Sequence, residues 1–178
     1  TGATTYSAPE GDGTRDLLEK VTVSSGSLRD HLVWQLELTH FSDSDEHIAR
    51  IIIDSIDDDG YLPVSTEDIH SNLDARLEID HDEVEAVLHR IQQFDPIGVG
   101  ARNLQESLQI QLQHFDPDTP WLQEARILVR DYFNLLSNRD YTRLGRKLKL
   151  TTDDLQHVIH LIQSMNPRPG SRFNTSEP

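Results

Sequence analysis

The sequence predicts an all-α protein of two small helical bundles, the second with a helix-turn-helix-like outline. Apolar residues recur every three or four positions along most of the chain, and no useful stretch alternates as a strand would. Glycine and proline gather between the periodic segments, which marks turns and breaks. These observations predict a flexible acidic linker tail (1–26), an N-terminal helical subdomain (27–115), a C-terminal helical subdomain (119–170) and a linker (171–178).

The composition favours a cytosolic protein. The chain of 178 residues has no cysteine, which excludes disulfides and thiolate chemistry. It contains neither an apolar run long enough to span a membrane nor a charged-then-apolar leader, so we expect no membrane span and no signal peptide.

The net charge of −15 is unevenly distributed. Residues 1–95 hold 22 acidic and 6 basic side chains, whereas residues 96–178 hold 9 and 10. The acidic half should repel phosphate backbones and be attracted to a basic partner surface. The alternative is a solvated acidic face that only keeps the protein soluble.

The first two helices are predicted from leucine and isoleucine spacing. Leu28, Leu32 and Leu36 predict a helix from Leu28 to about Leu38, with Trp34 as a core anchor. A second helix should begin after Ser42 or Ser44. Its predicted buried face consists of Ile48, Ile51, Ile52 and Ile56.

The acidic run 57–60 (Asp-Asp-Asp-Gly) could suggest a calcium loop. However, Ser55 and Thr66 would occupy the positions where an EF-hand needs an aspartate and a bidentate glutamate. We therefore interpret the run as a helix end with a glycine stop, after which Tyr61 and Leu62 enter the core.

Two further helices precede the glycine-rich segment. Ser65 or Thr66 should cap a short helix that runs through Leu73. Asp80 and Glu83 have the spacing of a capping box. The helix that follows has the clearest apolar stripe in the chain, formed by Val84, Val87, Leu88 and Ile91.

Residues 94–104 should form a compact elbow between two helices. Pro96 disfavours helix at the residue before it, and Gly98 and Gly100 permit positive φ or close backbone approach. Asn103 is a suitable cap for the next helix, whose predicted apolar face consists of Leu104, Leu108 and Leu112.

The polar residues Asp95 and Arg102 bracket this elbow. We expect them to cap the adjacent helix ends or to pair with each other, rather than to contact a partner.

Residues 114–120 are the predicted break between the subdomains. Thr119 followed by Pro120 should cap a long helix. The residues expected to line that helix are Trp121, Ala125, Leu128, Val129, Tyr132 and Leu136.

A basic segment and a final helix complete the second subdomain. Residues 139–150 carry five basic side chains against the single Asp140 and predict a short basic helix. Residues 151–154 (Thr-Thr-Asp-Asp) should cap the final helix. Its predicted apolar face consists of Leu155, Val158, Ile159, Ile162 and Met165.

Motifs of catalysis and cofactor binding are missing from the sequence. It has no HExxH, no phosphate-binding loop and no GxSxG nucleophile elbow. His157 and His160 lie three residues apart, but two imidazoles without a third ligand make a weak metal site. We therefore expect no enzyme activity, no cofactor, no metal and no small-molecule substrate.

Three long segments resemble one family. They read WQLELTHFSDSDEHIARIIIDSIDDDGYL, FDPIGVGARNLQESLQIQL and LIQSMNPRPG, in that order. Together they resemble the core-binding region of the sigma-54 (RpoN-type) bacterial transcription factors, from about Leu28 to Gly170. The elbow residues that carry the family signature are Phe94, Asp95, Pro96, Gly98, Val99, Arg102 and Leu104.

The resemblance implies a transcription function in the bacterial cytoplasm. Such a region docks the factor onto core RNA polymerase, and the resulting holoenzyme opens promoters only when an ATP-hydrolysing activator remodels it. The resemblance also implies an internal fragment of a longer factor, whose other regions would meet the activator and read promoter DNA.

Two groups of charged residues are candidate contact sites. The candidate polymerase-facing acids are Asp43, Asp45, Glu46, Asp57, Asp58 and Asp59. The candidate DNA-proximal basic residues are Arg139, Arg143, Arg146, Lys147 and Lys149. The basic residues could instead only balance the neighbouring acidic bundle, which we favour. The alternative function for the whole chain is an acidic helical adaptor that binds a basic protein without a polymerase role.

Overall fold

A computed structural model describes residues 27–174, and this part of the chain contains nine α-helices, two 3₁₀ helices and no β-strand. The predicted tail (1–26) and the end of the predicted linker (175–178) lie outside the described residues. In order, the elements are α2 (Leu28–Leu38), α3 (Asp43–Ser55), α4 (Thr66–Ser71), η1 (Ala75–Leu77), α5 (His81–Ile91), α6 (Leu104–Gln113), α7 (Leu122–Asp131), α8 (Phe133–Ser137), α9 (Tyr141–Leu148), α10 (Thr152–Gln163) and η2 (Pro169–Phe173). The all-α prediction is confirmed for the described residues.

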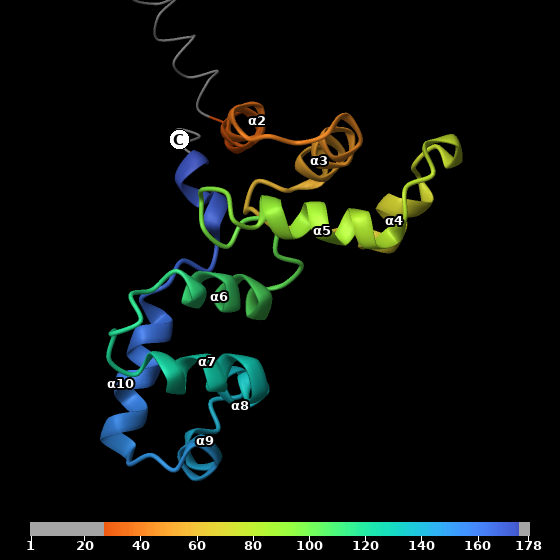
Figure 1. Cartoon of the computed structure of the whole chain (residues 1–178). Coiled ribbons are helices and arrows are strands. Elements are labelled where there is room, and N and C mark those ends of the chain that lie inside the picture. Colours follow the sequence, from red (N-terminus) through yellow and green to blue (C-terminus); the bar gives the residue numbers. More distant parts are fainter. Residues whose placement is uncertain (1–26, 175–178) are drawn as a thin grey trace, which may run out of the picture.

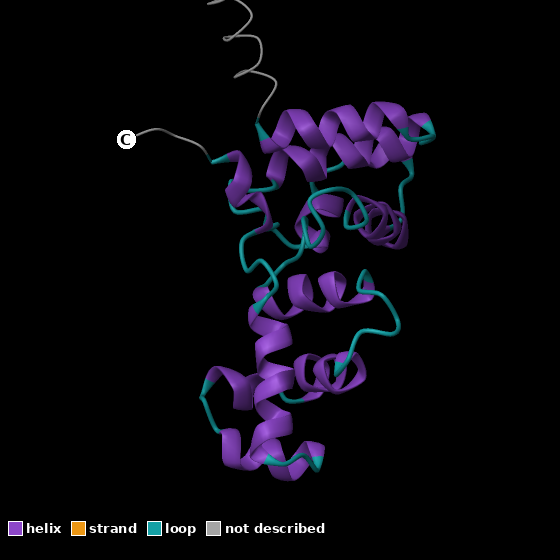
Figure 2. Ribbon diagram, turned by 90° about the vertical axis from the view of Figure 1, so that its left-hand side faces the viewer, coloured by secondary structure: helices purple, strands orange, loops and turns teal. Residues whose placement is uncertain are grey.

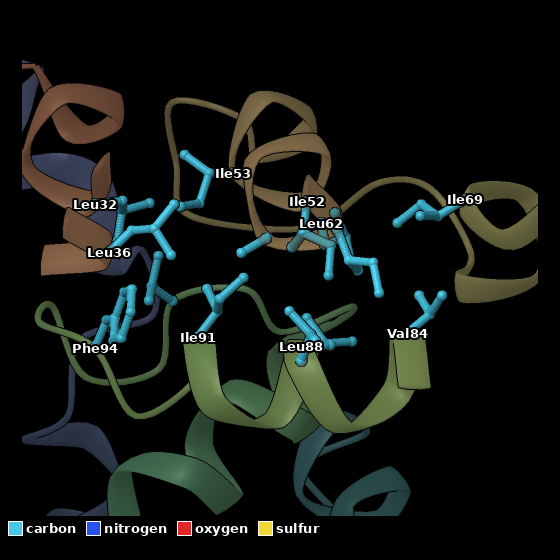
Figure 3. Close-up of a cluster of buried hydrophobic side chains, with 14 of the residues drawn as sticks. Leu32, Leu36, Ile52, Ile53, Leu62, Ile69, Val84, Leu88, Ile91 and Phe94 are labelled. Carbon is cyan, nitrogen blue, oxygen red and sulfur yellow. The ribbon is translucent and has the colours of Figure 1, made fainter. Parts of the chain in front are cut away.

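A first apolar cluster joins α2, α3, α4 and α5, which lie together in the upper half of Figure 1. Every residue of the predicted stripe of α5 is buried. Figure 3 shows these side chains meeting those of α2 and α3. The labelled members are Leu32, Leu36, Ile52, Ile53, Leu62, Ile69, Val84, Leu88, Ile91 and Phe94.

Helices α6, α7, α9 and α10 lie together in the lower half of the molecule (Figure 1 and Figure 2). A second apolar cluster joins them. Its fully buried members include Ala125, Leu128, Val129, Leu144 and Val158. Helix α6 belongs here, because Leu108 and Leu112 pack in this cluster. The subdomain limits stay a prediction, but the packing of α6 favours a boundary earlier than residues 114–120.

Most helix starts follow the predicted caps. At the predicted caps Ser42, Ser65, Asn103 and Thr151, the side chain accepts a hydrogen bond from the N–H of the third residue after it. Ser27, for which no cap was predicted, does the same at the start of α2. Asp80 and Glu83 form the predicted capping box at the start of α5.

Helix α7 begins two residues later than predicted. Its cap is Trp121, whose φ of 68° lies in the left-handed region. Thr119 contributes its carbonyl, which accepts a hydrogen bond from the Leu122 N–H, rather than a side-chain cap. The turn at 116–119, closed by a hydrogen bond from the Thr119 N–H to the Asp116 carbonyl, delays the start of the helix.

The prediction of one long helix from Trp121 to Leu136 is wrong, because this part of the chain forms two helices, α7 and α8, separated at Tyr132. The break frees carbonyls at the end of α7. The Gln105 side-chain amide donates to two of them, at 2.9 Å from Val129 O and 3.3 Å from Arg130 O. Leu128 and Val129 are buried before the break, and Phe133, Leu135 and Leu136 are half-buried after it. The apolar period of the sequence therefore continues through the break.

Trp34 is not a core anchor. The buried leucines of α2 are Leu28, Leu32 and Leu36, whereas 56% of the Trp34 surface is exposed. Successive residues turn by about 100° around a helix, so Trp34 points roughly opposite to Leu32.

The chain returns to the first bundle after α10. The end of the predicted C-terminal subdomain and the start of the predicted linker together form η2, which lies beside α2 in Figure 1. Phe173 packs against the first cluster, and the Gly170 N–H donates to Asp59 O at 2.9 Å. As a result, Ser27 and Asn174 line the same hollow of about 250 Å³, floored by Leu32 and Ile53.

Candidate functional site

The elbow at residues 94–104 is the centre of a three-segment junction between the bundles. The Gly100 N–H donates to Gly60 O at 2.8 Å, and the Leu62 N–H donates to Ala101 O at 2.9 Å. Gly170 then packs against the other side of the same 57–62 segment. All three segments that carry the family resemblance therefore contribute to one junction.

Two glycines of the junction are required by close approach. Gly98 has a φ of +93°, and a Cβ on it would lie 2.6 Å from Ser107 Oγ and 2.9 Å from Gln111 Nε2. A Cβ on Gly170 would lie 2.9 Å from the backbone nitrogen of Gly60. Neither position has room for any other residue without a local shift.

Two glutamines each bind the backbone of a different residue that precedes a proline. Gln35 accepts from the Asp95 N–H at 2.8 Å and donates to its carbonyl, and Asp95 is joined to Pro96 by a cis peptide bond. In the same way, Gln111 accepts from the Asn166 N–H at 3.0 Å and donates to its carbonyl at 2.7 Å. Each glutamine side chain thus satisfies both the N–H and the C=O of a turn residue whose backbone makes no helical hydrogen bond.

The Asp95 carboxylate joins three elements. It accepts hydrogen bonds from His31 of α2, at 2.8 Å, and from Arg172 of η2. Partial burial opposes ionisation of Asp95, but the hydrogen bonds from His31 and Arg172 outweigh it, so the pKa of this carboxyl lies below its usual value. Asp95 is therefore ionised at neutral pH in the folded protein, and it ties η2 to α2.

The prediction that Asp95 and Arg102 pair with each other is wrong. Arg102 instead binds Glu106 at 2.8 Å and approaches Glu85 at 3.7 Å. Hydrogen bonding to Glu106 raises the pKa of the Arg102 guanidinium. Arg102 thus lies between α5 and α6.

The other signature residues of the elbow divide between core and surface. Phe94 and Val99 are buried in the first cluster, and Pro96 is buried beside them. Leu104, which was expected on the buried face of α6, is 38% exposed because it occupies the first position of that helix.

The candidate acids do not form one patch. Asp43, Asp45 and Glu46 occupy the first turn of α3, and residues 57–59 follow its last turn. The 13 residues of α3 separate the two groups by about 20 Å.

The second acidic group is partly used by the fold. Asp57 Oδ1 accepts from the N–H groups of Asp59 and Tyr61, each at 3.0 Å, and thereby closes the turn. The carbonyls of Asp58 and Asp59 accept hydrogen bonds from Asn174 and Gly170.

The candidate basic residues lie together around α9, and all five are exposed. Arg139 precedes the helix with a φ of 56°, so the basic helix is shorter than predicted. Among the residues that the structure describes, only Arg143 of the five pairs with an acid, at 3.5 Å from Asp140. However, α10 begins with Asp153 and Asp154, which place negative charge beside this cluster.

Sequence reasoning missed an exposed apolar pair on α2. Trp34 and Leu38 are 56% and 66% exposed and lie one turn apart. The leucine spacing contained the signal, because both residues fall roughly opposite to Leu32 and Leu36 on a helical projection.

Comparison with known proteins decides the family. The model of the sigma-54 factor core-binding domain matches residues 17–178, which is most of the chain. The chain belongs to the sigma-54 core-binding domain family.

Relatives from several bacteria resemble this sigma-54 core-binding domain closely. The RNA polymerase sigma-54 factor of Azotobacter vinelandii is 54% identical over 157 residues, covering 88% of this chain and 31% of the relative. That of Salmonella typhimurium is 48% identical over 177 residues, covering 99% and 37%. That of Escherichia coli is 51% identical over 152 residues, covering 85% and 32%. The chain thus spans about a third of the length of these curated relatives.

Metal-ligand clusters and membrane-spanning helices are both absent from the described part of the chain. Within residues 27–174, no three His, Asp or Glu side chains come together as metal ligands would. No helix in the same range is both long and apolar enough to cross a lipid bilayer.

Proposed function

We propose that this chain docks a sigma-54-type factor onto core RNA polymerase, as part of a holoenzyme that depends on an ATP-hydrolysing activator. The family match over residues 17–178 carries this proposal. The match to proteins named RNA polymerase sigma-54 factor supports it. The chain would then act as a binding module in the bacterial cytoplasm rather than as an enzyme.

The charge of the first bundle supplies a physical route to the polymerase. Residues 27–100 hold 18 acidic and 4 basic side chains. Such a field speeds encounter with a basic surface and disfavours acidic partners. We propose that the acids at the start of α3, namely Asp43, Asp45 and Glu46, face the polymerase, because they are not part of the junction.

The acids at the other end of α3 are weaker candidates. Asp57 closes its own turn, so its replacement would disturb the fold as well as the charge. Asp58 is exposed and stays a candidate for polymerase contact, whereas Asp59 is half-buried against the η2 segment.

A salt-dependent titration tests this function. Purified core RNA polymerase is titrated with the chain by calorimetry at two salt concentrations. We expect saturable binding that weakens with salt. Absence of binding by a folded chain would refute the proposal.

A matched pair of variants tests the role of the acids. Replacing Asp43 and Asp45 with asparagine and Glu46 with glutamine should weaken binding and flatten its salt dependence. The control makes the same charge change elsewhere on the first bundle, with Asp68→Asn, Glu78→Gln and Asp82→Asn. These side chains are exposed and make no hydrogen bond or ion pair with another residue in the range 27–174. Equal effects of the two variants would show that only net charge matters.

A second candidate function is contact with promoter DNA phosphates by the basic residues around α9. Four of the five basic residues have no acid partner among the described residues, and this supports the candidate. The acids at the start of α10 argue against base reading by that helix, because a recognition helix contacts DNA through its N-terminal residues. Filter binding without salt-dependent DNA affinity would favour simple charge balance instead.

An acidic adaptor for a basic protein would share the same charge and periodicity. Recovery of core polymerase subunits with the chain from bacterial lysate supports the polymerase function. Recovery of a single small basic protein, without polymerase, would support the adaptor.

A further inference from the structure

Helix α2 has a second apolar face that residues 27–174 leave exposed. Leu28, Leu32 and Leu36 fill the core on one side, while Trp34 and Leu38 point to solvent on the other. Large apolar side chains on a monomer surface are usually scattered singly, whereas these two lie one turn apart. Trp34 and Leu38 are also the most exposed large apolar residues among residues 27–174.

The Trp34 ring is held in place by its neighbours. It stacks on the His31 ring at 6.1 Å between centroids, with an angle of 19° between the planes. His31 lies 5.1 Å from the Phe173 ring and hydrogen-bonds Asp95. A side chain that is ordered before binding loses less conformational entropy when a partner covers it.

Acidic side chains flank the apolar pair. Glu37 lies between Trp34 and Leu38 in the sequence, and the first turn of α3 follows Leu38 after a four-residue loop. Arg50 links the two helices, at 2.9 Å from Glu46 and 3.9 Å from Glu37. Four acids therefore share this end of the molecule with two arginines. The second is Arg90, whose guanidinium lies over the Phe41 ring at 3.7 Å and donates to His40 O at 2.9 Å in the loop between the helices. We call the set the α2–α3 corner: Trp34, Glu37, Leu38, Asp43, Asp45 and Glu46.

We propose that core RNA polymerase docks on the α2–α3 corner, with Trp34 and Leu38 entering an apolar pocket whose rim carries lysine or arginine. This inference rests on the proposed function and assigns it to a surface. Tryptophan in the centre of an interface, surrounded by polar contacts that exclude water, is the usual composition of a binding hot spot.

The negative charge of the corner distinguishes among the molecules that could bind this surface. A second copy of the chain would bring four acids against four acids, which opposes association. Nucleic acid would be repelled for the same reason. An apolar pocket on a protein, with basic residues at its rim, would cover the exposed apolar pair and also complement the acids that flank it.

Alanine variants test the anchors directly. Trp34→Ala and Leu38→Ala should each raise the Kd for core polymerase at least tenfold, while circular dichroism and the urea midpoint stay close to those of the parent chain. The matched control is Leu77→Ala, which removes another exposed apolar side chain of the first bundle and should change the Kd less than twofold.

A spectroscopic probe separates contact from indirect effects. The chain has two tryptophans, and Trp121→Phe leaves Trp34 as the sole site for 5-fluorotryptophan. The ¹⁹F resonance of Trp34 should shift on binding polymerase, and its response to exchange of H₂O for D₂O should fall as water is excluded.

The outcomes are distinguishable. If the parent chain does not bind core polymerase, the proposed function fails and the inference fails with it. If the parent binds and both alanine variants bind equally well, the docking site is elsewhere while the function stands. An unchanged ¹⁹F signal in the bound state would also overturn the inference, even if Trp34→Ala weakened binding.

Discussion

Replacing Gly170 with alanine should detach η2 from the first bundle. The new Cβ would lie 2.9 Å from Gly60 N and 2.9 Å from the carbonyl carbon of Asp59. Both are backbone atoms, which cannot rotate away as a side chain could. The simplest relief is for the segment that contains residue 170 to move off the surface on which it packs.

The contacts that would be lost limit the size of the effect. Three hydrogen bonds hold the segment: Gly170 to Asp59, Tyr61 to Pro167, and Asn174 to Asp58. Each contributes about 1 kcal/mol net. The exposed ion pair between Arg172 and Asp95 adds less than about 1 kcal/mol. We therefore expect a loss of roughly 3–4 kcal/mol in the free energy of unfolding if all of these contacts open.

Urea unfolding and amide hydrogen exchange would measure this effect. The amide at position 170 should lose its protection from exchange, because its acceptor is Asp59 O. Ser171→Ala is the control, since Ser171 lies in the same segment with an exposed side chain. A loss below about 0.5 kcal/mol for Gly170→Ala, with the amide still protected, would refute the packing argument.

Other predictions concern the two cores and the junction. Leu88→Ala should cost about 2–5 kcal/mol in urea unfolding, because the side chain is fully buried in the first cluster. Leu144→Ala should lower the midpoint reported by Trp121 fluorescence, because both residues belong to the second cluster; an unchanged midpoint would contradict that assignment. The lowered pKa of Asp95 means that its stabilisation is present at neutral pH and is lost as the pH falls through the folded-state pKa. Asp95→Asn should therefore be less stable than the parent in urea unfolding at pH 7, by less than about 1 kcal/mol. The difference should disappear only at a pH below the folded-state pKa of Asp95. Gly98→Ala should destabilise by more than about 1 kcal/mol in urea, from positive φ and the contact with the α6 side chains.

Local signals predicted the helices well because they depend on short spacing. The stripe of α5 and the caps at Ser42, Asp80 and Asn103 lie where the sequence predicted them. Each depends on contacts within one turn, which the sequence alone determines.

Features that depend on distant partners were not predictable in this way. The break at Tyr132 is stabilised by Gln105, an amide 24 residues before Val129. Asp95 was expected to find a local partner, but its partners His31 and Arg172 lie 64 and 77 residues away. Nothing in the spacing of a chain indicates such pairs.

The candidate site, too, was predictable only in those features that do not depend on distant partners. Resemblance identified the elbow segments, but their meeting at one junction became visible only in the structure. The Trp34–Leu38 pair was readable from helical angles and was missed because tryptophan most often anchors a core.

The shared hollow beside Ser27 and Asn174 has a mechanical consequence. When a polypeptide enters and leaves a domain at nearly the same point, the bulk of that domain lies to one side of the line that joins the preceding and following regions. Tension between the preceding and following regions of a longer protein would load the contact between η2 and α2 first. The second helical cluster would carry none of that force until this contact had opened.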